Sequence, residues 1–290
     1  MSDMNKAYKL AALAVRQRFA EQHPEYLETL AAIEKGDVAV YSGTYDSVEK
    51  VLAQLNVPAA INPDSLRASI IFVNCSSSYK SELLNRLRRH VENGSWLVTS
   101  DWALHHAIEQ MFPDTVRWTK RATPDEVISV EPDLYSLWSE VAVLGADPQW
   151  WLEGGSQPID VLDSERVRVE AASHDLLVRQ NAPAVAVTFD WHKGHVFHVI
   201  SHFWLKRSRM PGSRYSGPCT DFLKAGMKLS DEGIEKVLSE ARIKSEDVNF
   251  AMIQSAATST ELVAQLCVRA AVEFPRPPGD SFIEWLFGTA

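Results

Sequence analysis

Short apolar runs alternate with amphipathic helical segments between residues 37 and 111, and this alternation constrains the fold more than any other feature. The apolar runs occupy residues 38–43, 58–61, 69–75 and 96–101, and the first of them ends in small residues. The intervening segments with helical spacing occupy residues 48–56, 81–92 and 103–111. The run 69–75 is apolar on both faces, as expected for a strand inside a parallel sheet. The pattern predicts an α/β fold with a doubly wound, mostly parallel sheet and helices on both faces.

Beyond residue 116 the pattern changes to paired strands. Residues 167–170 and 176–178 predict one hairpin, and residues 185–191 and 195–204 predict a second one across His192-Lys193-Gly194. The segment 150–156, with two tryptophans and two glycines, predicts a loop anchored by aromatic side chains. A stretch rich in serine, proline and glycine follows at 208–220 and predicts a loop or linker.

Both ends of the chain have helical periodicity. Residues 4–34 predict one or two helices, and helix starts with a capping serine and early acids occur at Ser230, Ser245 and Ser259. We therefore divide the chain into an N-terminal helical extension (1–35), an α/β domain (36–207), a linker (208–228) and a C-terminal helical region (229–290). The final segment is strongly apolar and predicts docking onto the protein itself or a partner; its apolar residues are Phe282, Trp285, Leu286 and Phe287.

Composition excludes some classes of function. The net charge of −9 argues against a protein devoted to nucleic-acid binding. No apolar run approaches the roughly 18 residues of a membrane span, and the N-terminal stretch has no signal-peptide pattern. The three cysteines are widely spaced and fit neither a disulfide framework nor a zinc motif. We expect a cytoplasmic protein without cofactor or metal, and a protein partner or a second copy of the chain.

Several stretches resemble the class I glutamine amidotransferase-like superfamily, including its ThuA-like relatives. The resemblance spans residues 37–207, and its carriers are Val38–Gly43, Ile70–Ser78, Leu87–Trp102 and Gly194–Trp204. It implies a three-layer, flavodoxin-like domain in which one strand leads into a sharp elbow. Active members carry a cysteine nucleophile at that elbow, and a late strand delivers a histidine to it.

The chain departs from that pattern at the elbow. The elbow positions read Thr99-Ser100-Asp101-Trp102-Ala103, with no cysteine and no glycine pair to permit a strained turn. Asp101 is expected to act as an N-terminal cap for the helix 103–111. His202 resembles the late histidine, but Trp204 stands where the family has an acid. The resemblance therefore implies a degenerate member that has lost the usual thiolate chemistry.

Other candidate residues have two interpretations each. Cys75 follows a buried strand, where a thiol is usually a small hydrophobe, although it remains a candidate nucleophile. His198 and His202 are expected on one face of a single strand, packed or hydrogen-bonded rather than metal-bound. Trp151 and Glu153 predict either a pocket lining or a buried aromatic clamp.

Three functions compete on this sequence. The first is a non-catalytic scaffold or interaction protein, and the resemblance favours a component of a bacterial multi-protein assembly. The second is a sensor for a sugar or nucleotide at the strand edge, with candidate ligand-binding residues Gly43, Ser76, Ser77 and Asp101, joined by Trp151, Glu153 and His202. The third is a hydrolase or transferase with a relocated site that uses Cys75 or Asp101 with His202.

Overall fold

The computed structural model describes residues 3–133, 149–208 and 213–275. The expected partner-binding residues Phe282, Trp285, Leu286 and Phe287 lie outside the described residues. Within the described part of the chain, no helix combines the length and apolar character that a membrane crossing requires.

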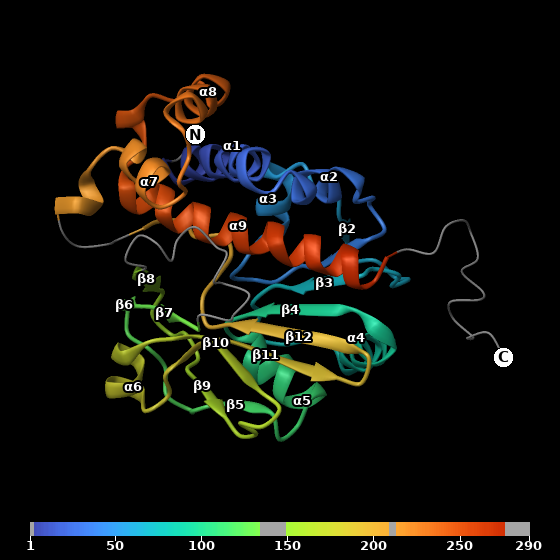
Figure 1. Cartoon of the computed structure of the whole chain (residues 1–290). Coiled ribbons are helices and arrows are strands. Elements are labelled where there is room, and N and C mark those ends of the chain that lie inside the picture. Colours follow the sequence, from blue (N-terminus) through green and yellow to red (C-terminus); the bar gives the residue numbers. More distant parts are fainter. Residues whose placement is uncertain (1–2, 134–148, 209–212, 276–290) are drawn as a thin grey trace.

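A mixed sheet forms the centre of the molecule (Figure 1). Its parallel part has the order β2-β1-β3-β4-β12, with each neighbouring pair in parallel register. The strands are β1 (Val38–Tyr41), β2 (Ala60–Ile61), β3 (Ile70–Val73), β4 (Trp96–Ser100) and β12 (Gly194–Val199). The order 2-1-3-4 is that of flavodoxin-like folds, in which ligands bind at the carboxyl ends of the strands. The predicted α/β architecture is therefore confirmed.

Antiparallel strands extend the sheet beyond β12. They are β11 (Ala184–Trp191), β10 (Arg168–Ala172) and β7 (Glu131–Pro132). The pair β5 (Val116–Trp118) and β9 (Ile159–Val161) joins at β11, whereas β6 (Glu126–Ser129) and β8 (Gln149–Leu152) form a separate small sheet. The predicted hairpin across residues 192–194 is confirmed, because Trp191 pairs with Gly194 in an antiparallel ladder.

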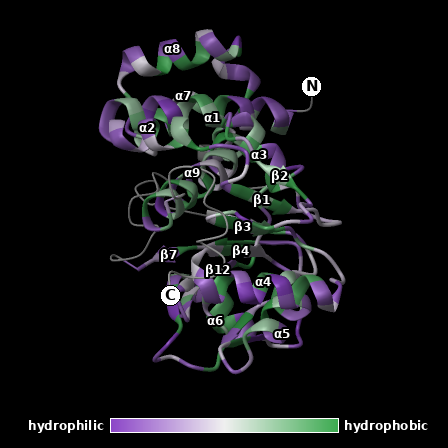
Figure 2. Ribbon diagram, turned by 90° about the vertical axis from the view of Figure 1, so that its right-hand side faces the viewer, coloured by the Kyte–Doolittle hydropathy of each residue, from purple (hydrophilic) through white to green (hydrophobic). Residues whose placement is uncertain are grey.

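Helices cover both faces of the sheet. On one face lie α1 (Asp3–Gln22), α3 (Val48–Gln54) and α9 (Phe250–Glu273), which pack on one another and, through α9, on β3 (Figure 1). On the other face lie α4 (Ser81–Gly94) and α5 (Glu109–Met111), the latter preceded by a π-helical turn at Leu104–Ile108. Figure 2 shows hydrophobic strands at the centre and a largely hydrophilic exterior on α4. Burial of the apolar strand faces under both helical layers is the main stabilising contribution to such a fold.

The two helical ends of the chain pack together. Helix α1 runs along α9, and α2 (Pro24–Ala32), α7 (Cys219–Ala225) and α8 (Asp231–Ala241) complete this layer. Arg18 of α1 forms an ion pair with Glu261 of α9, and both side chains are buried. Tyr8 of α1 stacks on Trp204 with ring centroids 4.1 Å apart. One continuous hydrophobic core therefore joins the helical layer to the sheet.

Some local predictions were wrong. Residues 176–178 belong to α6 (His174–Gln180) instead of a hairpin strand, because the Ser173 side chain accepts a hydrogen bond from the backbone N–H of Leu176 and starts a helix. Ser259 does not start a helix; it lies inside α9, which is capped by Asn249. Ser230 does cap α8 as predicted. The segment 150–156, predicted as a loop, begins as strand β8.

Candidate functional site

Three of the candidate residues meet at the carboxyl edge of the parallel strands. Cys75 lies beyond β3, Asp101 follows β4, and His202 lies beyond β12. One ligand atom from each of the three side chains lies within 4.8 Å of the other two. Parallel strands bring their carboxyl ends to one edge, so residues far apart in the sequence become neighbours there. We call Cys75, Asp101 and His202, together with Glu153, the edge cluster.

Asp101 makes the elbow without glycine. Its φ is 44°, a left-handed conformation that aspartate tolerates better than most residues. Its backbone N–H donates to the carbonyl of Val199 on β12 at 2.9 Å. The sequence lacks the glycine pair expected for a strained turn at the elbow, yet Asp101 adopts the left-handed conformation without it.

The side chain of Asp101 does not cap the following helix. Its Oδ1 accepts a hydrogen bond of 2.9 Å from the backbone N–H of Gln157, and Ser156 Oγ lies 3.5 Å from Oδ2. The π-helical turn that follows has no side-chain cap. The predicted capping role is thus wrong, because the loop after β8 supplies a better-placed donor. The carboxylate is held toward the edge cluster instead.

His202 lies between two carboxylates. Its Nδ1 is 2.8 Å from Glu153 Oε2, and its Nε2 is 3.3 Å from Asp101 Oδ2. Glu153 comes 49 residues earlier in the chain. Trp204 stands where the resemblance led to the expectation of an acid, yet the histidine does have an acid partner from a different loop. The absence of an acid inferred from the sequence was therefore wrong for the folded chain.

His198 does not share the environment of His202. It lies within β12, is fully buried, and its Nδ1 is 2.8 Å from Thr99 Oγ1 on the neighbouring strand. Burial lowers the pKa of His198 to about 3, which keeps the ring neutral. Because β12 ends at Val199, His202 falls in the following loop, and the prediction that both rings share one strand face was wrong.

The contacts of His202 favour its charged form. Burial acts to lower the pKa of His202, but contacts with Asp101, Cys75 and Glu153 outweigh it and raise the pKa well above 6.5. The hydrogen bond from His202 lowers the pKa of Glu153. Burial raises the pKa of Asp101, and His202 only partly opposes that effect. These contacts favour an imidazolium form of His202, flanked by the carboxyl groups of Glu153 and Asp101.

The Cys75 thiol is shielded. Cys75 is 1% exposed. Burial raises the pKa of the thiol, although contacts with His202 and the backbone N–H of Trp102 act to lower it. The thiolate is the reactive form of cysteine, so this environment favours an unreactive thiol. The exposures of Asp101 and His202 are 3% and 7%.

Aromatic side chains pack in the segments that carry Asp101 and Glu153. The indole N–H of Trp102 donates to the carbonyl of Gly155 at 2.8 Å, and Tyr45 packs edge-on against Trp102. Trp151 is 1% exposed, and its indole N–H donates to Asp125. The Arg207 guanidinium lies over the Trp151 ring at 4.9 Å. Trp151 thus belongs to the packed interior rather than to an open lining.

Asp46 organises the edge, a role that the sequence analysis missed. Its Oδ1 accepts from the backbone N–H of Ser47 at 2.7 Å and of Trp204 at 3.0 Å. Its Oδ2 accepts from Ser100 Oγ at 2.7 Å and from the backbone N–H of Phe203 at 2.9 Å. The sequence signal for this role is an aspartate in the short polar segment that follows an apolar strand.

The remaining strand-edge candidates have ordinary contacts. A Cβ atom at Gly43 would lie 2.3 Å from the carbonyl oxygen of Cys75, so close backbone packing requires glycine there. Ser76 Oγ lies 3.4 Å from Thr44 Oγ1, and Ser77 is exposed.

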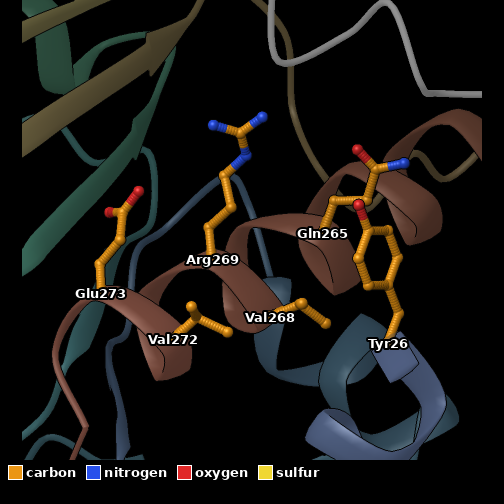
Figure 3. A pocket seen from close by; sticks show the side chains of 6 residues that line it. All are labelled: Tyr26, Gln265, Val268, Arg269, Val272 and Glu273. Carbon is orange, nitrogen blue, oxygen red and sulfur yellow. The ribbon is translucent and has the colours of Figure 1, made fainter.

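A separate hollow of about 210 Å³ lies between α2 and the end of α9 (Figure 3). Its lining residues are Tyr26, Gln265, Val268, Arg269, Val272 and Glu273, none of which the sequence analysis singled out. No residue of the edge cluster contributes to this hollow.

Comparisons with known proteins show similarity of fold at low sequence identity. No family model matches the chain, and no curated protein matches it. A ThuA-like protein from Bacteroides uniformis is 13% identical, with a TM-score of 0.42 over 59% of this chain and 83% of that one. A cytoplasmic protein from Salmonella typhimurium is 14% identical, with a TM-score of 0.40 over 59% of this chain and 91% of that one.

Parts of larger enzymes also align with this chain. A β-galactosidase from Rahnella sp. R3 is 11% identical, with a TM-score of 0.42 over 59% of this chain. This chain spans only 29% to 34% of the length of the β-galactosidases that it matches. Similarity at this level concerns the fold alone and assigns no family and no activity to this chain.

Proposed function

We propose that this chain is a non-catalytic interaction protein built on an amidotransferase-like α/β domain. The observation that carries the proposal is the closure of the edge cluster. Cys75, Asp101 and His202 are 1%, 3% and 7% exposed. Nucleophilic catalysis requires a reacting group that substrate can reach and a base that can take up a proton.

The electrostatics of the cluster support the same proposal. A cysteine hydrolase needs a thiolate, whereas burial raises the pKa of Cys75. A general base needs a free lone pair, whereas the raised pKa of His202 favours a ring protonated on both nitrogens. Asp101 stands at the elbow, but its carboxylate is already bonded to the Gln157 N–H and faces His202. The residues of a former active site thus hold loops together.

Cys75 is expected to react slowly with alkylating reagents. In EDTA-treated protein at pH 7, we expect its rate with iodoacetamide to be at least about tenfold below that of a free thiol, because its pKa is raised and it is buried. Peptide mapping by mass spectrometry separates it from Cys219 and Cys267, which are also buried and serve as internal comparators. Urea-unfolded protein is the control, in which all three should label at similar rates.

The opposite outcome would favour a cysteine hydrolase or transferase. One observation supports this second function: Cys75, His202 and Glu153 form a continuous thiol, imidazole and carboxylate series. Alkylation of Cys75 faster than that of a free thiol would contradict the non-catalytic proposal and make this series the candidate machinery.

The proposed interaction role predicts that the chain associates with itself through its apolar final segment. We expect the full chain to self-associate in sedimentation velocity experiments. A variant in which residues 279–290 are replaced by a Gly/Ser segment of equal length should be monomeric, because the aromatic side chains at 282–287 are lost. Asp231→Asn, a change at an exposed side chain outside the final segment, is the control and should associate like the wild type. A monomeric wild type at all concentrations would contradict self-association.

A further inference from the structure

The edge cluster brings three different metal-ligating atoms to one point. Cys75 offers sulfur, Asp101 a carboxylate oxygen and His202 an imidazole nitrogen, all within 4.8 Å of one another. Two ligands bonded to Zn²⁺ at about 2.0 Å with a tetrahedral angle lie roughly 3.3 Å apart. The distance from His202 Nε2 to Asp101 Oδ2 is 3.3 Å. Among the described residues, no other group of three such side chains lies this close together.

His202 is oriented as a zinc-ligating histidine would be. Its Nδ1 is held by Glu153 Oε2 at 2.8 Å, which directs Nε2 toward Cys75 and Asp101. Nε2 is buried and makes no well-aligned hydrogen bond in this position. Ligating histidines usually donate their other N–H to a carboxylate, which sets the ring tautomer and orientation. Glu153 occupies that supporting position.

The ligand positions are set before any ion arrives. Asp101 is held by the Gln157 N–H, and Asp46 ties the loop that carries His202 to the end of β4. Hard cations such as Ca²⁺ and Mg²⁺ prefer oxygen ligands only. A thiolate and an imidazole with one carboxylate suit Zn²⁺, which takes these ligand types in tetrahedral sites.

We infer that the edge cluster binds one Zn²⁺ ion through Cys75 Sγ, a carboxylate oxygen of Asp101 and His202 Nε2, with Glu153 supporting the imidazole. Binding displaces the thiol proton of Cys75 and the Nε2 proton of the imidazolium. The charge of the ion is then balanced by the thiolate and the Asp101 carboxylate. The site corrects the sequence-based expectation of no metal: its ligands come from three separate loops, so cysteine spacing along the chain does not indicate it. This inference is independent of the non-catalytic proposal.

Titration of the full-length, EDTA-stripped protein with ZnCl₂ against a chromophoric chelator tests the site. We expect one Zn²⁺ per chain and a higher thermal unfolding temperature, because an ion that binds only the folded state stabilises it. Substitution with Co²⁺ should give tetrahedral d–d absorption and a thiolate-to-cobalt charge-transfer band. Less than one equivalent of tightly bound Zn²⁺, or a Co²⁺ spectrum without the thiolate band, would overturn the inference.

Variants assign the ligands. Cys75→Ser and Asp101→Asn should weaken Zn²⁺ binding at least tenfold, and Glu153→Gln by about 10–100-fold through loss of the supporting carboxylate. Cys219→Ser, another buried cysteine outside the cluster, and His105→Gln, in a neighbouring pair of histidines, should bind like the wild type. If His105→Gln loses Zn²⁺ binding and Cys75→Ser keeps it, the ion binds to histidines on the surface, and the edge-cluster site is refuted. If Cys75→Ser does not fold, the wild-type Co²⁺ spectrum decides.

Discussion

Replacing Asp46 with asparagine is expected to lower the free energy of unfolding by about 3–6 kcal/mol, as two charge-assisted hydrogen bonds of about 1.5–3 kcal/mol each are lost. The Asp46 carboxylate accepts from Ser47, Ser100, Phe203 and Trp204 and is only 2% exposed. An amide would turn an NH₂ group toward two of these donors. Urea denaturation followed by far-UV circular dichroism measures the change.

Asp231→Asn is the matched control for this experiment. Its side chain is 78% exposed and pairs only with an exposed lysine, so the expected change is within about 0.5 kcal/mol. A loss below about 1 kcal/mol in Asp46→Asn would show that the two loops and the end of β4 joined by Asp46 are held by other contacts.

Replacing His202 with alanine is expected to cost about 3–5 kcal/mol at neutral pH, because the buried Asp101 carboxylate loses its cation. Glu153 loses its partner as well, but its side chain is 30% exposed, so water compensates part of that loss. The change is measured in EDTA-containing buffer to keep the protein free of metal. A cost below about 1 kcal/mol would contradict the ion-paired description of the cluster.

The pH dependence distinguishes loss of charge from loss of volume. Because the folded pKa of His202 is raised, its contribution is complete below its unfolded pKa of 6.5 and is lost as pH rises through the folded value. The folded pKa of Asp101 is also raised, so its contribution to stability likewise declines as pH rises, but over a lower pH range. The folded pKa of Glu153 is lowered, so its contribution to stability is present above its unfolded pKa of 4.5 and is lost as pH falls through its folded pKa. His202→Ala should therefore lack the wild-type decline above pH 6.5.

His105→Ala is the control for this profile. His105 is half-exposed and pairs with Glu109 on the surface, so its removal should leave the alkaline decline intact. A wild-type stability that stays flat between pH 6.5 and the folded pKa of His202 would contradict the assigned ion pairs. The same profile measured with saturating Zn²⁺ should differ, because the metal replaces the Nε2 proton.

Local periodicity was sufficient to predict the parallel sheet and most of its helices. Strands such as 69–75 are apolar on both faces, and their alternation with helices allows few other arrangements. The prediction of secondary structure failed where a short apolar run has no intrinsic preference for strand or helix. Residues 176–178 are apolar like a strand, yet one hydrogen bond to Ser173 makes them helical. Short runs of this kind depend on capping and tertiary contacts.

The site was predicted in part, for a reason of topology. Cys75 and Asp101 lie at the ends of recognisable strands, so their approach at one edge could be inferred. His202 was expected inside the strand 195–204, but that strand ends at Val199. Glu153 was a candidate ligand-binding residue, but its pairing with His202 could not be predicted, because Glu153 follows β8, which belongs to a separate small sheet. The left-handed backbone at Asp101 was missed as well, since only packing against β12 and the loop after β8 maintains it.

The position of α9 has a consequence for synthesis on the ribosome. Helix α9 covers the β3 side of the sheet and pairs with α1, yet it is made about 180 residues after β3 ends. Until α9 has left the exit tunnel, one apolar sheet face and the inner side of α1 stay exposed to solvent and to other nascent chains. Chains with such late closure are prone to aggregate and to engage chaperones. Stop codons or ribosome stalling before Phe250 should therefore yield insoluble fragments, not a smaller folded domain.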